Sequence, residues 1–246
     1  MKGRFFTTPH YTEHLSENVI LRLPNRQFVF TVPKILRLYF KNGRNLFADI
    51  SKFIFSIINE YYNVVAKIDL KSAAIVSHQS FDDMMRPNSH FHTIILEGGI
   101  DNDGSFHSIP IKDTSNLTEL FRRKVISYFV NKKLLNEKFA RNLLSWKHSG
   151  FSVDNSILIP AQDQKARTGL SQYIARHPVS LNKIIYIPEK AQVLYKTKYN
   201  DYFGENIQFF TATDFIAELT MHIPPKHKHL VNPSDCTILW YLFQQE

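Results

Sequence analysis

Two histidines separated by a single residue, His90 and His92, form the first candidate site. The surrounding segment over 90–97, His-Phe-His-Thr-Ile-Ile-Leu-Glu, is apolar and β-branched, which predicts a strand. Alternate residues of a strand face the same side, so both imidazoles project together while Phe91 points toward the core. Two imidazoles about 6–7 Å apart on a strand can share one divalent metal ion if a third ligand comes from elsewhere.

A second His-x-His pair, His227 and His229, follows Pro224-Pro225 in a basic segment. With 11 histidines in 246 residues, chance alone gives roughly 0.5 such matches. The first pair is the better candidate because its apolar strand context would fix the ligands, whereas solvated histidines are the plainer interpretation of the second.

Tyr173 lies on a predicted helix over 162–177, with Arg176 and His177 beside it. A tyrosine that cleaves a phosphodiester must lose its phenolic proton, whose reference pKa is about 10. It also needs cations to neutralise the charge that develops on the phosphate. The alternative is an ordinary residue at the edge of the core, the commoner role of a tyrosine on an amphipathic helix.

Trp146, Lys147 and His148 mix aromatic and basic side chains that could stack on and neutralise single-stranded nucleic acid. With Arg176 they are the candidate DNA-binding residues. The alternative is a helix end anchored by its tryptophan.

The composition restricts the class of protein. The chain has 246 residues and a formal net charge of 30 − 22 = +8, which favours a polyanionic partner or serves solubility alone. One cysteine, Cys236, excludes an internal disulfide or a zinc finger built from cysteines. The N-terminus lacks the apolar core of a signal peptide, and no apolar run reaches the length of a membrane span. We therefore expect a soluble cytoplasmic protein with no membrane partner.

Periodicity predicts the elements that position these residues. A helical stripe covers 33–66 with a break near Gly43, and further helices cover 115–134, 136–146 and 162–177. Strands are expected over 27–32, 73–80 and 90–97, with a returning strand over 105–109 and a hairpin of 184–187 with 193–196. A last helix, capped by Thr213 or Asp214, runs to about His222. Together they indicate one α+β domain, whose central antiparallel sheet carries the His-x-His strand and is flanked by helices.

Several segments, in order along the chain, resemble the rolling-circle insertion-sequence transposases of the HUH (His-hydrophobic-His) tyrosine endonuclease superfamily. These segments are an opening block (25–34), a metal motif (90–99), the surroundings of the catalytic tyrosine (147–154, 159–161, and 173–176 with Pro178 and Ser180) and a closing block (213–218 and 222–224).

The resemblance implies an HUH-endonuclease-like fold and cleavage of single-stranded DNA at the insertion-sequence ends. His90 and His92, with a third ligand, would hold Mg²⁺ or Mn²⁺ on the scissile phosphate. Tyr173 would attack and leave a 5′-phosphotyrosine and a free 3′-hydroxyl, and the reverse step on a new 3′ end would transfer the strand. His177, one turn after the nucleophile, is the third ligand expected by similarity, and Gln79 on the neighbouring predicted strand is its rival.

The chain departs from many of these relatives in three places. Position 177 is His where a second tyrosine often stands, so the resemblance is to the single-tyrosine subgroup. Those relatives begin with a Cys-rich zinc-binding segment, which we do not expect here because the sequence starts too late to contain it. Residues 237–245 differ from the expected continuation, and we interpret them as the product of a frameshift near residue 231.

The expected organisation is thus an N-terminal extension (1–24), a catalytic domain (25–223) and a divergent, frameshifted tail (224–246). The expected function is that of a transposase in a bacterial cytoplasm, associated with the nucleoid when bound to DNA. Two alternatives stay open. An inactive DNA-binding remnant would bind single strands without forming an adduct, and an unrelated metal-dependent phosphoesterase would use activated water and be indifferent to Tyr173→Phe.

Overall fold

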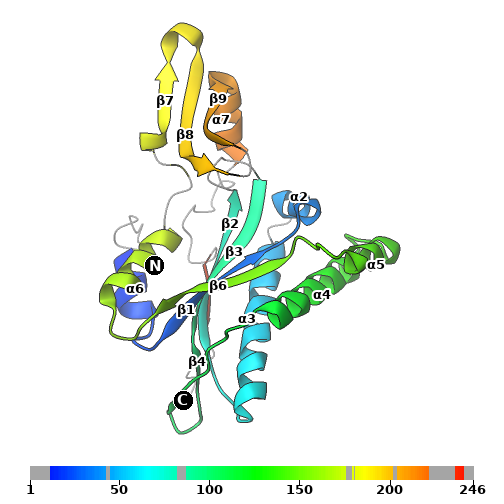
Figure 1. Ribbon diagram of the computed structural model, residues 1–246, viewed down its shortest axis with the longest axis vertical. Helices are drawn as coiled ribbons and strands as arrows, with labels where there is room; N and C mark the ends of the chain where they lie inside the picture. Colours follow the sequence, from blue (N-terminus) through cyan, green and yellow to red (C-terminus); the bar gives the residue numbers. More distant parts are fainter. Residues whose placement is uncertain are drawn as a thin grey trace, which may run out of the picture.

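A five-stranded antiparallel sheet forms the centre of the structure (Figure 1), a computed structural model that describes residues 12–42, 45–81, 87–175, 179, 181–201, 204–221 and 236–240. The strand order is β10-β2-β3-β1-β6. The strands are β1 (Asn25–Thr31), β2 (Ala73–Phe81), β3 (Pro87–Leu96), β6 (Ser152–Ile159) and β10 (Cys236–Trp240). The strand that carries the two histidines, β3, is therefore the middle one, held by a neighbour on each side.

The pairing register fixes which side chains share a face, because residues directly opposite each other on paired strands point the same way. His90 lies opposite Thr31 of β1 and Gln79 of β2. His92 lies opposite Val29 and Ser77 in the same way. We call the side of the sheet that carries these residues the histidine face.

The opposite side, which we call the aromatic face, presents Phe28, Phe30 and Phe91, all fully buried. The helices α2 (Lys34–Asn42), α3 (Asn45–Ala66), α4 (Ser115–Asn131) and α5 (Glu137–Ser145) belong to this side. Phe30 meets Phe121 of α4 edge-on, with ring centroids 5.0 Å apart. Each buried phenylalanine contributes about 1.5–3 kcal/mol through removal of its apolar surface from water. This core anchors the central strands and their register.

Two short segments cover part of the histidine face. They are the π-helical turn η1 (Leu15–Val19) and the helix α6 (Gln164–Ala175). Leu170 and Ile174 of α6 join Ile75 and Ile94 of the sheet in a second apolar cluster. The cluster also includes Leu15, Val19, Ile20 and Ile159.

A smaller antiparallel sheet, in the order β7-β8-β9, lies apart from the central sheet at the top of Figure 1. Its strands are β7 (Ile184–Ile187), β8 (Gln192–Asn200) and β9 (Glu205–Thr211), with the 3₁₀ turns η2 (Leu181–Lys183) and η3 (Pro188–Lys190) beside β7. The helix α7 (Ala212–Met221) follows β9 and packs on one side of this sheet.

The predicted α+β class and most of the predicted elements are confirmed, with differences in detail. The cap of α7 is Thr211, rather than Thr213 or Asp214, because its hydroxyl accepts the Asp214 backbone N–H at 3.1 Å. The expected break near Gly43 falls outside the described residues, as does the helix end at His222. The strands β9 and β10 have no counterpart among the predicted elements.

The returning strand predicted over 105–109 is present as β5 (Phe106–Ser108), and its partner is the strand β4 (Gly98–Ile100). Gly98 has a φ of 141°, and a Cβ there would lie 1.9 Å from the His107 carbonyl oxygen. Glycine is thus required by close backbone approach within the hairpin, and not by a chain reversal.

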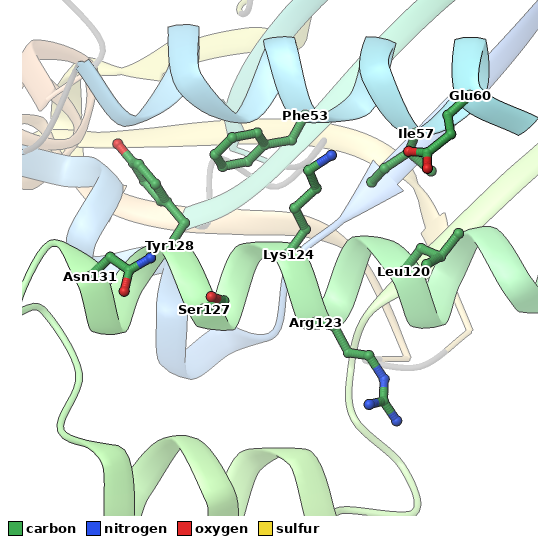
Figure 2. A pocket seen from close by; sticks show the side chains of 9 residues that line it. All are labelled: Phe53, Ile57, Glu60, Leu120, Arg123, Lys124, Ser127, Tyr128 and Asn131. Carbon is green, nitrogen blue, oxygen red and sulfur yellow. The ribbon is translucent and has the colours of Figure 1, made fainter.

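A pocket of about 460 Å³ lies between α3 and α4 (Figure 2). Lys124 reaches across it to donate to the Ser56 hydroxyl at 2.7 Å. Tyr128 donates to Asp49 at 2.5 Å, and burial and this carboxylate together raise the pKa of its phenol, which therefore stays protonated. The pocket belongs to the aromatic side of the sheet and is separate from the histidines.

Candidate active site

The central strand presents His90 and His92 as a pair. Their ring centroids are 4.7 Å apart, with the ring planes at 76°. His92 is only 3 % exposed, and Phe91 between them is fully buried on the opposite face. The predicted alternation, imidazoles on one side and phenylalanine in the core, is confirmed.

The hydrogen bond of His90 determines which of its ring nitrogens can bind a metal. Nδ1 lies 2.7 Å from the backbone carbonyl oxygen of Asn88. A carbonyl only accepts, so Nδ1 carries the proton and Nε2 carries the lone pair. A carbonyl that orients a histidine through its other nitrogen is a frequent feature of metal sites.

His92 is held by Gln27 of β1, whose Nε2 lies 3.3 Å from His92 Nδ1. His92 Nε2 and Gln27 Oε1 are both buried without a hydrogen-bond partner. Rotating the Gln27 amide by half a turn would let Oε1 accept from Nδ1–H, leaving the Nε2 lone pair for a metal ion. Burial, reinforced by His90, lowers the pKa of His92 to about 3, so its ring is neutral at pH 7, as a ligand must be.

The helix α6 brings Tyr173 to these histidines from a distant part of the sequence. The ring of Tyr173 meets that of His92 edge-on, with centroids 5.0 Å apart and planes at 87°. Tyr173 is 41 % exposed, so its side chain borders both the buried histidine and solvent. The predicted nucleophile and the predicted metal ligands therefore lie at one site on the histidine face.

Buried neighbours fix the position of α6. Leu170 and Ile174, on either side of Tyr173, pack in the cluster that includes Ile94, two residues beyond His92 on the same face. Arg167, 3 % exposed, donates to the Ala161 carbonyl at 2.9 Å. The tyrosine is thus positioned by an anchored helix and not by a surface loop.

The third metal ligand stays a prediction. His177 and the DNA-binding candidate Arg176 lie outside the described residues. The rival ligand Gln79 is half-buried and lies directly opposite His90 on the same face. Within the described part of the chain, no group of three or more His, Cys, Asp or Glu residues is placed to hold a metal ion. His90 and His92 suit a metal ion, and the described residues place no third His, Cys, Asp or Glu beside them.

The structure does not bring Trp146, Lys147 and His148 to this site. They follow α5, on the aromatic side of the sheet, and all three are exposed. The Trp146 indole N–H donates to Asn142 Oδ1 at 2.7 Å, one turn back along α5. Their proposed role in DNA binding stays a prediction.

Gln27 is the site residue that sequence reasoning missed. Its side chain is only 5 % exposed. A buried amide needs a hydrogen-bond partner, so its burial indicates a specific contact. The available signal was its alternation with Phe28 in the strand Asn-Arg-Gln-Phe-Val-Phe-Thr, which places Gln27, Val29 and Thr31 on one side.

The geometry of this site can now be set beside known proteins. A family model described as "Putative transposase" matches residues 74–232, about two thirds of the chain, including β3, α6 and the smaller sheet. No curated protein and no solved structure gave a match. No helix in the described segments has the length and apolar character needed to cross a membrane. Because the family model covers well over half of its length, the chain belongs to this family of transposases.

Proposed function

We propose that this transposase is of the HUH type, with a single catalytic tyrosine that cleaves and rejoins single-stranded DNA. The observation that carries the proposal is the edge-on contact of Tyr173 with His92, beside His90 on the middle strand of an antiparallel sheet. A nucleophile next to paired imidazoles suits phosphodiester cleavage, because attack and charge neutralisation act on the same phosphate.

The protein atoms that would hold a divalent cation, Mg²⁺ or Mn²⁺, are the Nε2 atoms of His90 and His92. When bound there, the cation would supply Lewis-acid stabilisation of a phosphate oxygen. Asn88 and Gln27 would orient the two rings through their Nδ1 atoms. We propose His177 as the third ligand, with Gln79 as the alternative.

Tyr173 would form the covalent link. Its phenolate oxygen bonds to phosphorus while the bond from phosphorus to the 3′ oxygen breaks, which leaves a 5′-phosphotyrosine and a free 3′-hydroxyl. The phenolic proton leaves the tyrosine, and a proton is taken up by the departing 3′ oxygen. A new 3′-hydroxyl then attacks the phosphotyrosine and transfers the strand, so the bond energy is conserved and no nucleotide cofactor is consumed.

The test uses end-labelled single-stranded DNA that covers the ends of the insertion element, incubated with the protein and Mn²⁺. We expect a protein–DNA band that survives denaturation and is lost in Tyr173→Phe. Tyr186→Phe is the matched control, since Tyr186 is also exposed (54 %) but lies on β7 of the smaller sheet, and it should form the band normally.

The other outcomes separate the alternatives. Salt-sensitive binding without any covalent band would indicate an inactive DNA-binding remnant. Cleavage with a freely released product in both the parent and Tyr173→Phe would indicate a metal-dependent phosphoesterase that uses water. Either result contradicts the proposal.

A further inference from the structure

The smaller sheet has one covered side and one open side. Its register aligns Ile185, Leu194 and Phe209 in a row across the three strands. Lys196 and Ile207 form the next row on the same side, and Ile187, Gln192 and Thr211 form the row before it. We call this side the open face.

The other side of the sheet is packed against α7. Val193 and Tyr195 of β8 are buried together with Phe215 of α7, and Phe210 of β9 joins them. Phe209 and Phe210 are therefore neighbours in sequence with opposite environments. This side provides the core of the smaller sheet, so the exposed side chains opposite are not needed to form one.

The open face exposes apolar side chains that a protein surface usually hides. Phe209 is 62 % exposed, Ile185 40 % and Ile207 37 %. Scattered apolar residues on a surface are normal, but neighbouring ones in adjacent rows of one sheet indicate an interaction surface.

The three rows of this face carry one charged residue. Lys196 stands in the row beside Phe209 and is exposed. The residues that form these rows include no acidic side chain. Asp214 and Glu218 lie on α7 instead, which packs on the opposite side.

We infer that the open face binds single-stranded DNA, with a base stacked on Phe209 and the neighbouring phosphate at Lys196. An exposed aromatic ring on a flat sheet beside a lysine suits unpaired bases, since every base offers a π-face and every nucleotide a charge. The sheet lies within the residues that match the transposase family model. The inference rests on the proposed function only in taking single-stranded rather than duplex DNA as the substrate.

The experiment measures fluorescence anisotropy of a labelled oligothymidylate with the whole protein, in EDTA so that no cleavage occurs. Phe209→Ala should weaken binding about 5- to 100-fold, the range for loss of one stacked base. Phe209→Tyr keeps an aromatic ring, so its affinity should lie within about twofold of that of the parent. Lys196→Gln should weaken binding. It should also reduce the slope of log affinity against log salt concentration by the amount expected for about one phosphate contact.

The control is Ile216→Ala, because Ile216 is exposed to a similar extent (61 %) but lies on α7. It should leave affinity unchanged, and circular dichroism should show every variant folded. Equal affinity of Phe209→Ala and the parent would overturn the inference. So would a dimer of the parent, seen by sedimentation, that dissociates in Phe209→Ala while DNA affinity is unchanged, since the face would then bind a second copy of the chain.

Failure of this inference is distinguishable from failure of the proposed function. Absence of the covalent band in the parent would refute the catalytic proposal without a change in DNA affinity, whereas equal affinity of Phe209→Ala and the parent would refute the open face without loss of the band. A parent that forms no covalent band but loses affinity on Phe209→Ala would retain the open face as a binding surface and refute only the catalytic proposal.

Discussion

The two faces of the central sheet are made from the same strands and differ in what they do. On the aromatic face, Phe28, Phe30 and Phe91 are buried against helices and stabilise the fold. On the histidine face, Gln27 and His92 are also buried, and the Nε2 atom of His92 has no hydrogen-bond partner there. An unpaired buried polar atom costs about 1–3 kcal/mol, so this face is less stable than an apolar one would be.

The comparison shows how a strand can separate stability from chemistry. The period of two assigns neighbouring residues to opposite faces, so packing on one side fixes the register that aims side chains on the other. On this account, substitutions at adjacent positions should have opposite consequences, and the following experiments test that division.

The largest effect on chemistry is expected for His90→Ala. Loss of one metal ligand removes several kcal/mol of charge stabilisation, so the rate of covalent band formation should fall about 10³-fold or more. The thermal midpoint should shift little, because His90 is only half-buried. Normal band formation by His90→Ala would contradict this division between the two faces, since His90 would then have no role in the chemistry.

Phe91→Ala, at the next position, should do the reverse. Truncating a fully buried phenylalanine costs about 3–5 kcal/mol of unfolding free energy, measurable by urea denaturation. Band formation per folded molecule, assayed at low temperature, should stay near that of the parent. Phe91→Leu is the control, with a smaller loss of stability. Lost activity in folded Phe91→Ala would show that the two faces are coupled.

Gln27→Leu tests whether Gln27 is a positioning residue for His92. Removing the partner of a ligating histidine lowers metal affinity about 10- to 100-fold, so more Mn²⁺ should be needed for half-maximal band formation. The rate at saturating Mn²⁺ should change less. Phe28→Leu, one residue along on the aromatic face, should leave the Mn²⁺ requirement unchanged and lower stability instead. An unchanged Mn²⁺ requirement in Gln27→Leu would assign Gln27 to packing alone.

The smallest effect is expected for Asp101→Asn in the β4–β5 hairpin, beyond both faces. The His107 side chain and the backbone N–H groups of Ser105 and Asp103 lower the pKa of Asp101. A carboxyl with a lowered folded-state pKa stabilises above its unfolded pKa, about 3.9, and this contribution is lost as the pH falls through the folded value. The variant should therefore melt slightly below the parent at pH 7, and the gap should close once the pH is below the pKa of Asp101 in both the unfolded and the folded state. A gap that persists there, or any loss of band formation, would contradict this assignment.

The fold class and the orientation of His90 and His92 could be predicted because alternation in an apolar strand is a local property. The helix that carries Tyr173 was predictable for the same reason. Its contact with His92 was not, because it depends on tertiary packing of α6 through Leu170 and Ile174. At the level of sequence, only the resemblance to a family indicated that His90, His92 and Tyr173 belong to one site.

The remaining features depend on contacts between strands. Alternation with Phe28 places Gln27 on one side of its strand, but its partner His92 lies on another strand, and that pairing cannot be predicted from the pattern alone. Gly98 is a residue type common in turns, but it lies in the strand β4. Glycine is required there because the His107 backbone comes too close for a Cβ atom, and this contact has no signal in the local sequence. The open face of the smaller sheet follows from the pairing of β8 with β9, which no pattern within either strand specifies.

The most direct test of the central claim is to identify the residue that carries the DNA. The covalent band would be digested with trypsin and nuclease, and the modified peptide sequenced by mass spectrometry. We predict a nucleotide attached through its 5′ phosphate to Tyr173. A nucleotide on any other residue, or a 3′ linkage, would contradict the account of Tyr173 as the nucleophile beside His90 and His92.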